Sequence, residues 1–206
     1  MATGEMRAAA SAQAVSGDGT GRMTTEEMLR LKSTFLAPYM QLATALIGKT
    51  REGGGNMFRH HLDTMATLID YSYIDSVLLK ASVVHDLIED VPDFNRNLLM
   101  SIDYESPSVY NLVMEVTRYP GETKPEFLTR ILKTGSHHAK VLKVADRISN
   151  MISLGFVINY EFINRYTEET ARYIFPIAEE VDKFMLSELK SLVQSRRKYL
   201  SAIIPD

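Results

Sequence analysis

The sequence contains no cysteine. Disulfide frameworks and thiolate metal sites are therefore excluded, and any bound metal must use His, Asp, Glu, Asn, backbone or water as ligands. That set of ligands suits Mn, Fe, Mg or similar ions better than structural zinc. The lack of cysteine is also compatible with a cytoplasmic protein, which is the location we expect.

Long apolar runs and an excess of positive charge are missing as well. No segment approaches the roughly 20 apolar residues of a membrane-spanning helix, and the N-terminus has no hydrophobic signal core. The formal net charge is -3, whereas a general nucleic-acid-binding protein is usually basic. We therefore expect neither a membrane nor a nucleic acid as partner. A small phosphorylated molecule remains compatible with this composition, because a local basic pocket does not need a basic protein.

Large apolar residues are almost absent from the first 22 residues, which are rich in Ala, Ser, Gly and Thr. We interpret residues 1–23 as a disordered leader and exclude them from the fold. The chain as a whole is 45% hydrophobic, which is enough for one domain with a real core over residues 24–206.

Signals for β-strands are scarce, since few segments alternate between apolar and polar residues. Apolar residues instead recur every three or four positions, which predicts an all-α, single-domain helical bundle. Thr24 is expected to cap the first helix, and residues 74–89 are expected to form one helix. We expect two long C-terminal helices that are separated near Pro176. The glycine-rich segment 49–56 is a loop, either a plain connector or a backbone that approaches a ligand.

The segment Val83–Asp90 places potential metal ligands within an apolar stripe. His85 and Asp86 are neighbours about 100° apart on the predicted helix, so they can flank one ion. Glu89 and Asp90 follow one turn later. Burying such groups is costly unless they are paired or bind a metal, so the segment favours a metal site.

Two further segments share this character. Asp146 lies among small and apolar residues, with Asn150 one turn later, and the pair His60-His61 stands at the head of an apolar-patterned helix. Each segment alone has a plain interpretation, such as a surface pair between Asp146 and Arg147. Three helices that each offer a ligand in an apolar context favour metal-dependent chemistry.

Together these segments resemble the HD-domain phosphohydrolases, and most closely the hydrolase module of the Rel/Spo guanosine tetraphosphate enzymes and the small alarmone hydrolases. That family shows a His heading one helix, then His-Asp-x-x-Glu-Asp, then a Leu-Ala-Asp-Arg-Leu-x-Asn-Met-like segment. The corresponding residues here are His61, His85–Asp90 and Val144–Met151, and Glu115–Arg118 resembles the family's Glu-Val-Thr-Asp. The similarity covers about residues 44–154.

The resemblance implies an HD-type bundle that hydrolyses guanosine tetraphosphate and releases pyrophosphate from its 3′ position. It also implies Mn²⁺, with another divalent ion as the alternative. The implied metal ligands are His61, His85, Asp86 and Asp146. His60 competes with His61, which we prefer because it matches the family's interval to His85.

The same resemblance implies roles for residues around the ion. Glu89 and Asp90 would position and deprotonate water or protonate the leaving oxygen. Asn150 would hold the ribose or phosphate edge of the substrate. The candidate phosphate-binding cations are Arg51, Lys143 and Arg147. Arg147 has an alternative role, because it can pair with an acid instead.

The loop before the first motif departs from the family. The family carries Arg-Lys-x-Gly-x-Pro-Tyr there, whereas residues 51–57 read Arg-Glu-Gly-Gly-Gly-Asn-Met, and Leu62 replaces the usual Pro after the first His. Two alternatives therefore stay open: an HD-domain nucleotidase or hydrolase of another phosphorylated nucleotide, and a non-catalytic helical nucleotide-binding regulator. The expected partner is a small nucleotide, and the oligomeric state is left open.

Overall fold

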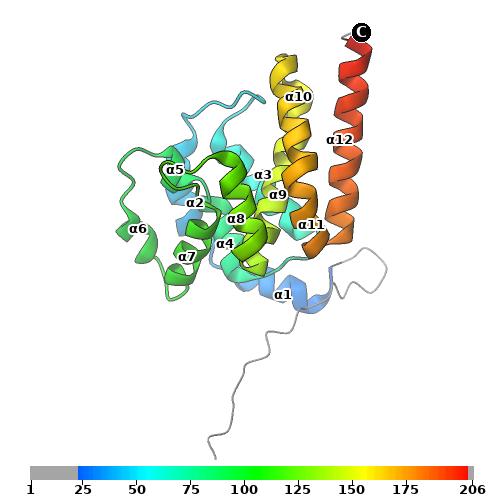
Figure 1. Cartoon of the computed structure of the whole chain (residues 1–206). Helices are drawn as coiled ribbons and strands as arrows, with labels where there is room; N and C mark the ends of the chain where they lie inside the picture. Colours follow the sequence, from blue (N-terminus) through cyan, green and yellow to red (C-terminus); the bar gives the residue numbers. More distant parts are fainter. Residues whose placement is uncertain (1–22, 204–206) are drawn as a thin grey trace, which may run out of the picture.

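The computed structural model describes residues 23–203, and every regular element in that range is a helix. The all-α prediction is thus confirmed, whereas the leader predicted for residues 1–23 lies, apart from its last residue, outside the described residues. None of the described helices combines the length and apolar composition that a membrane crossing requires. The elements (Figure 1) are α1 (Thr25–Ser33), α2 (Ala37–Ala43), η1 (Thr44–Leu46), α3 (Met57–Asp70), α4 (Ser76–Val84), α5 (Leu87–Asp90), α6 (Arg96–Met100), α7 (Ser106–Val116), α8 (Lys124–Thr134), α9 (His137–Ser153), η2 (Leu154–Phe156), α10 (Tyr160–Glu169), η3 (Thr170–Ile174), α11 (Phe175–Val181) and α12 (Lys183–Ile203).

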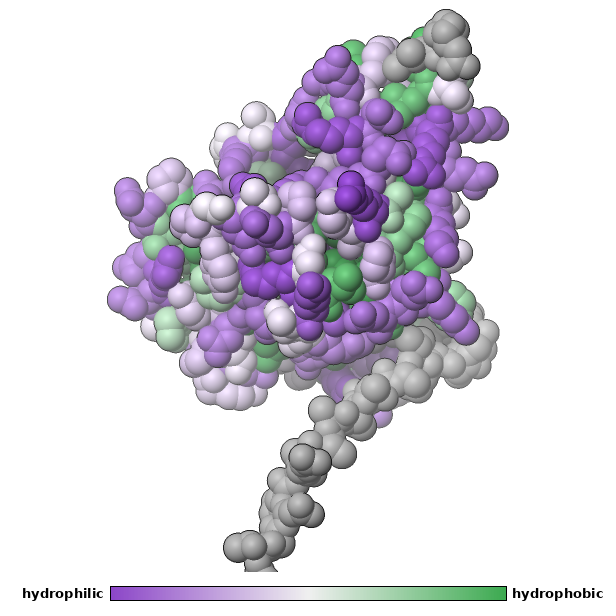
Figure 2. Space-filling view, viewed as in Figure 1, coloured by the Kyte–Doolittle hydropathy of each residue, from purple (hydrophilic) through white to green (hydrophobic). Residues whose placement is uncertain are grey.

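Helices α3, α4 and α9 form the centre of the fold. Every residue of α4 from Leu78 to Val84 is buried, and α3 packs against both α4 and α9. Figure 2 shows the complementary outside, where hydrophilic side chains cover most of the visible face. Polar groups on the central helices are therefore out of water and need partners within the protein or a ligand.

The C-terminal helices cover α9 from the other side. α10 lies beside α12, as Figure 1 shows, and both α11 and α12 pack against α9. The chain passes from α10 to α11 through η3, a single π-helical turn, and Pro176 stands in the first turn of α11. The predicted separation near Pro176 thus corresponds to the boundary between η3 and α11, although the backbone stays helical across it. Proline is well tolerated in a first helical turn, and the backbone leaves helical geometry only at Asp182, between α11 and α12.

Two helix starts show how the sequence sets up the site. Thr24 caps α1 in a capping box with Glu27, as predicted. Helix α3 begins at Met57, because the side chain of Asn56 accepts a hydrogen bond from the backbone N–H of Arg59. The pair His60-His61 consequently lies in the first turns of α3.

The helix predicted for residues 74–89 is interrupted. α4 ends at Val84, α5 begins at Leu87, and His85 and Asp86 lie in the turn between them. The carbonyl of Ser82, in the last turn of α4, accepts a hydrogen bond from Nδ1 of His85 at 2.7 Å. Imidazoles thus satisfy carbonyls that a helix end leaves without backbone partners, so the helix can stop there.

Candidate metal centre

Two histidine side chains meet at the end of α4 with their rings 4.3 Å apart. Nδ1 of His61 contacts the carbonyl of Val83, and Nδ1 of His85 contacts the carbonyl of Ser82, each at 2.7 Å. A carbonyl only accepts, so both Nδ1 atoms carry a proton, and each ring in its neutral form leaves a lone pair on Nε2. Neither buried Nε2 atom has a hydrogen-bond partner among residues 23–203. This is the arrangement of imidazoles that are held for a metal.

Two carboxylates face these nitrogens. Oδ2 of Asp86 lies 3.5 Å from Nε2 of His61 and 3.3 Å from Nε2 of His85. Oδ1 of Asp146, on α9, lies 3.8 Å from Nε2 of His85. The structure thus brings together all four predicted metal ligands. Their two imidazole nitrogens and two carboxylate oxygens fit a divalent ion such as Mn, Fe or Mg.

The field at this centre favours a cation. Burial opposes a charge on His85, but the carboxylates of Asp86 and Asp146 outweigh it and raise the pKa of His85 to about 9. Burial likewise opposes ionisation of Asp86, yet His85 and His61 hold its pKa well below the usual value. Two carboxylates that stay ionised inside the protein need positive charge, which a proton or a metal ion can supply.

His60 has a different role from its neighbour. Its Nε2 lies 2.9 Å from Oδ1 of Asp146, and its Nδ1 lies 2.9 Å from Oγ of Ser149. By distance alone it rivals His61, because ligand atoms of His60, His85 and Asp86 lie within 4.8 Å of one another. Both of its ring nitrogens are already hydrogen-bonded, however. The hydrogen bonds therefore favour His61 as ligand and His60 as the residue that orients Asp146.

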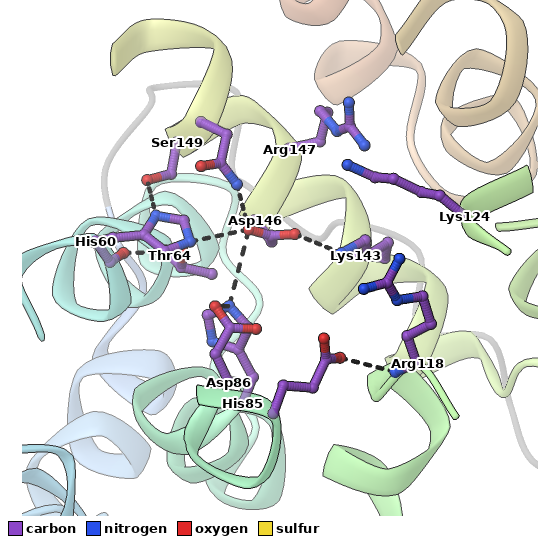
Figure 3. Close-up of polar contacts among 12 residues, drawn as sticks. His60, Thr64, His85, Asp86, Arg118, Lys124, Lys143, Asp146, Arg147 and Ser149 are labelled. Atoms are coloured by element: carbon purple, nitrogen blue, oxygen red, sulfur yellow. Dashed lines mark hydrogen bonds and ion pairs between the residues drawn. The ribbon is translucent and has the colours of Figure 1, made fainter. Parts of the chain in front are cut away.

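Asp146 is the hub of the polar contacts, as Figure 3 shows. Its Oδ2 accepts from Nζ of Lys143 at 2.7 Å, and its Oδ1 accepts from Nδ2 of Asn150 at 2.6 Å. Oδ1 of Asn150 in turn accepts from Nη2 of Arg51 at 2.5 Å. Asn150, predicted to hold the substrate, thus joins the glycine-rich loop to the metal centre.

The two acids of α5 point to different partners. Oε1 of Glu89 accepts from the backbone N–H of Arg118 at 2.7 Å, whereas Oδ1 of Asp90 pairs with Nζ of Lys49 at 2.5 Å. Burial raises the pKa of Glu89 above its ordinary value, and the nearby Asp86 adds to that effect. A raised pKa brings the Glu89 carboxyl closer to neutral pH, which makes Glu89 a candidate acid–base group.

Arg147, predicted as a phosphate-binding cation, instead binds residues of α10 and η3. Its guanidinium donates to Oε1 of Glu169 at 2.7 Å and to Oγ1 of Thr170 at 3.0 Å. The side chain is buried and its Cζ lies 4.1 Å from the centre of the Tyr166 ring. The structure contradicts the substrate-binding prediction and favours the alternative of a pair with an acid.

Two cations near the centre were missed by sequence reasoning. Figure 3 shows Arg118 and Lys124 with Lys143 along one side of Asp146. Nζ of Lys124 lies 3.2 Å from Oε1 of Glu169. Lys124 stands in the first turn of α8, after the capping box of Thr123. The capping box predicts the helix start, but only the packing of α8 on the other helices brings Lys124 to the site.

A pocket of about 210 Å³ adjoins the metal centre. The hydrogen-bond chain from Arg51 through Asn150 to Asp146 links the two. The rings of Phe162 and Tyr166 stack at 5.6 Å on one wall. Other lining residues include Arg51, Glu52, Met57, Asn150 and Leu154. Aromatic and apolar walls with a few polar groups suit a small organic ligand.

Comparison with known proteins points in the same direction as the motifs. No known family profile matches the sequence. The chain is 26% identical over 172 residues to a protein named probable guanosine-3′,5′-bis(diphosphate) 3′-pyrophosphohydrolase from Mycoplasma genitalium, which covers 72% of this chain. The chain spans 23% of that relative's length, about a quarter.

A solved structure shares the fold. It is described as a metazoan ortholog of SpoT that hydrolyzes ppGpp and plays a role in starvation responses. The superposition gives a TM-score of 0.64 at 20% identity and covers 85% of this chain and 97% of that one. The all-α fold and the resemblance that the motifs indicated are therefore confirmed.

Proposed function

We propose that this chain is a metal-dependent hydrolase of guanosine tetraphosphate that releases pyrophosphate from the 3′ position. The observation that carries the proposal concerns the Nε2 atoms of His61 and His85, which face the carboxylates of Asp86 and Asp146 and have no hydrogen-bond partner within residues 23–203. The substrate comes from the names of the sequence relative and the structural neighbour.

The metal ligands in this proposal are His61, His85, Asp86 and Asp146. Mn²⁺ is the ion that the resemblance favours, and the donor set accepts other divalent ions. Such an ion supplies Lewis acidity to phosphoryl oxygens and lowers the pKa of water. Lys143 and His60 hold Asp146 from two sides and so fix the direction of its carboxylate.

Glu89 is proposed as the acid–base residue of the reaction. A water oxygen forms a bond to the phosphorus on the 3′ oxygen, the bond from that phosphorus to the 3′ oxygen breaks, and the 3′ oxygen takes up a proton. The products are guanosine diphosphate and pyrophosphate. Glu89 accepts the proton of the attacking water, and its hydrogen bond from the N–H of Arg118 keeps the carboxylate in place. Asp90 supports the turn through Lys49.

The substrate lies across the centre in two parts. The nucleoside fits the pocket beside Phe162 and Tyr166, where aromatic rings suit a base. The phosphates lie toward Lys143, Lys124 and Arg118, on the other side of Asp146 (Figure 3). The hydrogen bonds from Arg51 to Asn150 and from Asn150 to Asp146 lie between these two parts of the substrate.

The test is turnover of guanosine tetraphosphate by the purified chain with Mn²⁺, followed by chromatography of the nucleotides and an assay for pyrophosphate. Guanosine diphosphate and pyrophosphate should appear in equal amounts, and a chelator should stop the reaction. Release of inorganic phosphate without pyrophosphate would contradict the proposed bond cleavage.

A second candidate is the hydrolysis of another phosphorylated nucleotide, either by a nucleotidase or by a hydrolase of a different 2′- or 3′-phosphate. Glu52 favours it, because an acid stands where the family carries a lysine and thereby changes the charge beside the pocket. A panel of nucleotides with Mn²⁺ separates the two, since rapid turnover of monophosphates without turnover of guanosine tetraphosphate supports the second.

A non-catalytic nucleotide-binding regulator is the third possibility. It predicts that the protein holds no metal and that Asp146→Ala changes none of its properties. The presence of all four ligands beside Glu89 supports the enzyme instead.

A further inference from the structure

Glu52 lies at the mouth of the pocket, in the loop between η1 and α3. Its Oε1 accepts a hydrogen bond from Nδ2 of Asn159 at 3.3 Å. The other oxygen, Oε2, makes no hydrogen bond with any residue in the described range 23–203. Asn159 also caps α10, because its Oδ1 accepts from the backbone N–H of Phe162 at 3.0 Å. The carboxylate is therefore anchored one helical turn from an aromatic wall of the pocket.

The backbone around Glu52 is held in place. The N–H of Gly54 donates to the carbonyl of Arg51, and the N–H of Arg51 donates to the carbonyl of Gly55. Gly53 packs against α9 so closely that a Cβ there would lie 3.1 Å from Cβ of Ser153. The turn is thus hydrogen-bonded and packs against α9, which fixes the position of the Glu52 backbone.

Two other polar side chains of the pocket, Arg51 and Asn150, are already engaged. Arg51 donates to Asn150, whose Nδ2 donates to Asp146, so these side chains serve the link to the metal centre. The Glu52 side chain is exposed, and the residues of the described range leave its Oε2 open to accept from a ligand. A carboxylate only accepts hydrogen bonds, so it selects a ligand edge that carries donors.

Guanine presents such an edge. Its N1–H and its exocyclic 2-amino group are adjacent donors, which a single carboxylate can accept together. Adenine has an acceptor at N1, whose lone pair would face the negative carboxylate. Hypoxanthine keeps N1–H but lacks the amino group, so it offers one of the two donors.

We propose that Glu52 is a specificity-determining residue, which selects guanine by accepting from N1–H and the 2-amino group. This rests on the proposed function, because it places the nucleoside of that substrate in the pocket. It also explains a use for the acid that this chain carries in place of the family's lysine.

The test is binding of guanosine, inosine and adenosine 5′-diphosphates by calorimetry, with Mn²⁺ present, to the native protein and to Glu52→Gln. The glutamine keeps an oxygen that accepts from Asn159, but it replaces the second acceptor by a donor. The native protein should prefer the guanosine compound over the adenosine compound by about tenfold to a hundredfold, with the inosine compound between them. Glu52→Gln should lose most of that preference.

Asn159→Ser is the matched control, since serine keeps the helix cap but cannot reach Glu52. It should reduce the preference for the guanosine compound by less than Glu52→Gln does, because Glu52 keeps its carboxylate and loses only its anchor. Equal binding of the three bases, no binding of any, or an unchanged preference in Glu52→Gln would overturn the assignment.

The two proposals fail in different ways. Hydrolysis of guanosine tetraphosphate without a base preference sinks the assignment of Glu52 and leaves the enzymatic proposal standing. A base preference that depends on Glu52, in a protein that does not hydrolyse guanosine tetraphosphate, supports the assignment of Glu52 and contradicts the enzymatic proposal.

Discussion

Helix α4 contributes to two buried polar clusters that differ in one respect. Lys80, with 3% of its side chain exposed, pairs with Asp103 at 2.7 Å and with Glu105. Five residues later, His85 and Asp86 join the cluster around Asp146. In the Lys80 cluster the acids meet a lysine of the same chain. In the metal centre Asp146 also meets a lysine, Lys143, but both carboxylates face imidazoles whose Nε2 atoms lack hydrogen-bond partners within the described range.

This difference in hydrogen-bond partners indicates which of the two clusters binds a ligand. Each acid of the Lys80 cluster also accepts a hydrogen bond from a hydroxyl group, Asp103 from Tyr39 and Glu105 from Ser76, so the acids and the lysine find their partners within the protein. Such a cluster contributes to the fold. In the metal centre Lys143 pairs with Asp146, but the Nε2 atoms of His61 and His85 are satisfied only by a proton or a metal ion, since no residue in the range 23–203 partners them. Substitutions in the two clusters should therefore affect different properties.

The largest effect is expected for His85→Ala. Loss of this proposed ligand should reduce kcat/KM for guanosine tetraphosphate by about a thousandfold or more, because the proposed reaction depends on an ion that His85 would help to hold. Metal content by elemental analysis should fall together with the activity. If the variant keeps both its metal and its turnover, the assignment of the centre is wrong.

The Lys80 cluster should respond in the opposite way. Lys80→Met leaves Asp103 and Glu105 without their cation and should lower the free energy of unfolding by about 3–5 kcal/mol, measured by urea denaturation. Arg197→Met, which removes an exposed pair with Glu168, serves as control and should cost under about 1 kcal/mol. Folded Lys80→Met protein should still bind Mn²⁺, and failure to do so would remove the distinction between the clusters.

Removal of the metal should have an effect of intermediate size on stability. With free Mn²⁺ at a hundred times its dissociation constant, a chelator should lower the free energy of unfolding by about 3 kcal/mol. Thermal denaturation with and without chelator measures this change. In Asp146→Asn the chelator should have little effect, and a full effect there would place the stabilising ion at another site.

The smallest effect distinguishes the two adjacent histidines. His60→Ala removes the support of Asp146 and should weaken Mn²⁺ binding by about tenfold to a hundredfold. His61→Ala removes a ligand and should weaken it further, to a level that titration calorimetry does not detect. The reverse order would assign His60 as the ligand and His61 as its support.

Much of the centre could be predicted because its ligands sit in short local motifs. His85 and Asp86 are neighbours, and Asp146 precedes Asn150 by one turn, so their relations follow from sequence alone. The three-to-four-residue apolar spacing also sufficed for the all-α fold.

The rest depended on packing between distant segments. The end of α4 at Val84 involves His61, which comes from α3 and donates to the carbonyl of Val83. The burial of Arg147 depends on Glu169 and Thr170, which stand where α10 passes into η3. No local pattern relates residues that lie more than 20 positions apart. Neither contact can therefore be predicted without the positions of the helices.

The break between α4 and α5 links the metal centre to local unfolding of the last turn of α4. Two of the proposed ligands, His61 and His85, hold carbonyls of the same last turn of α4. When that turn opens, both imidazoles lose the contacts that orient them, so the turn and the centre open as one cooperative unit. Metal loading should consequently slow amide hydrogen exchange in residues 82–88 more than in α12, where no proposed ligand resides.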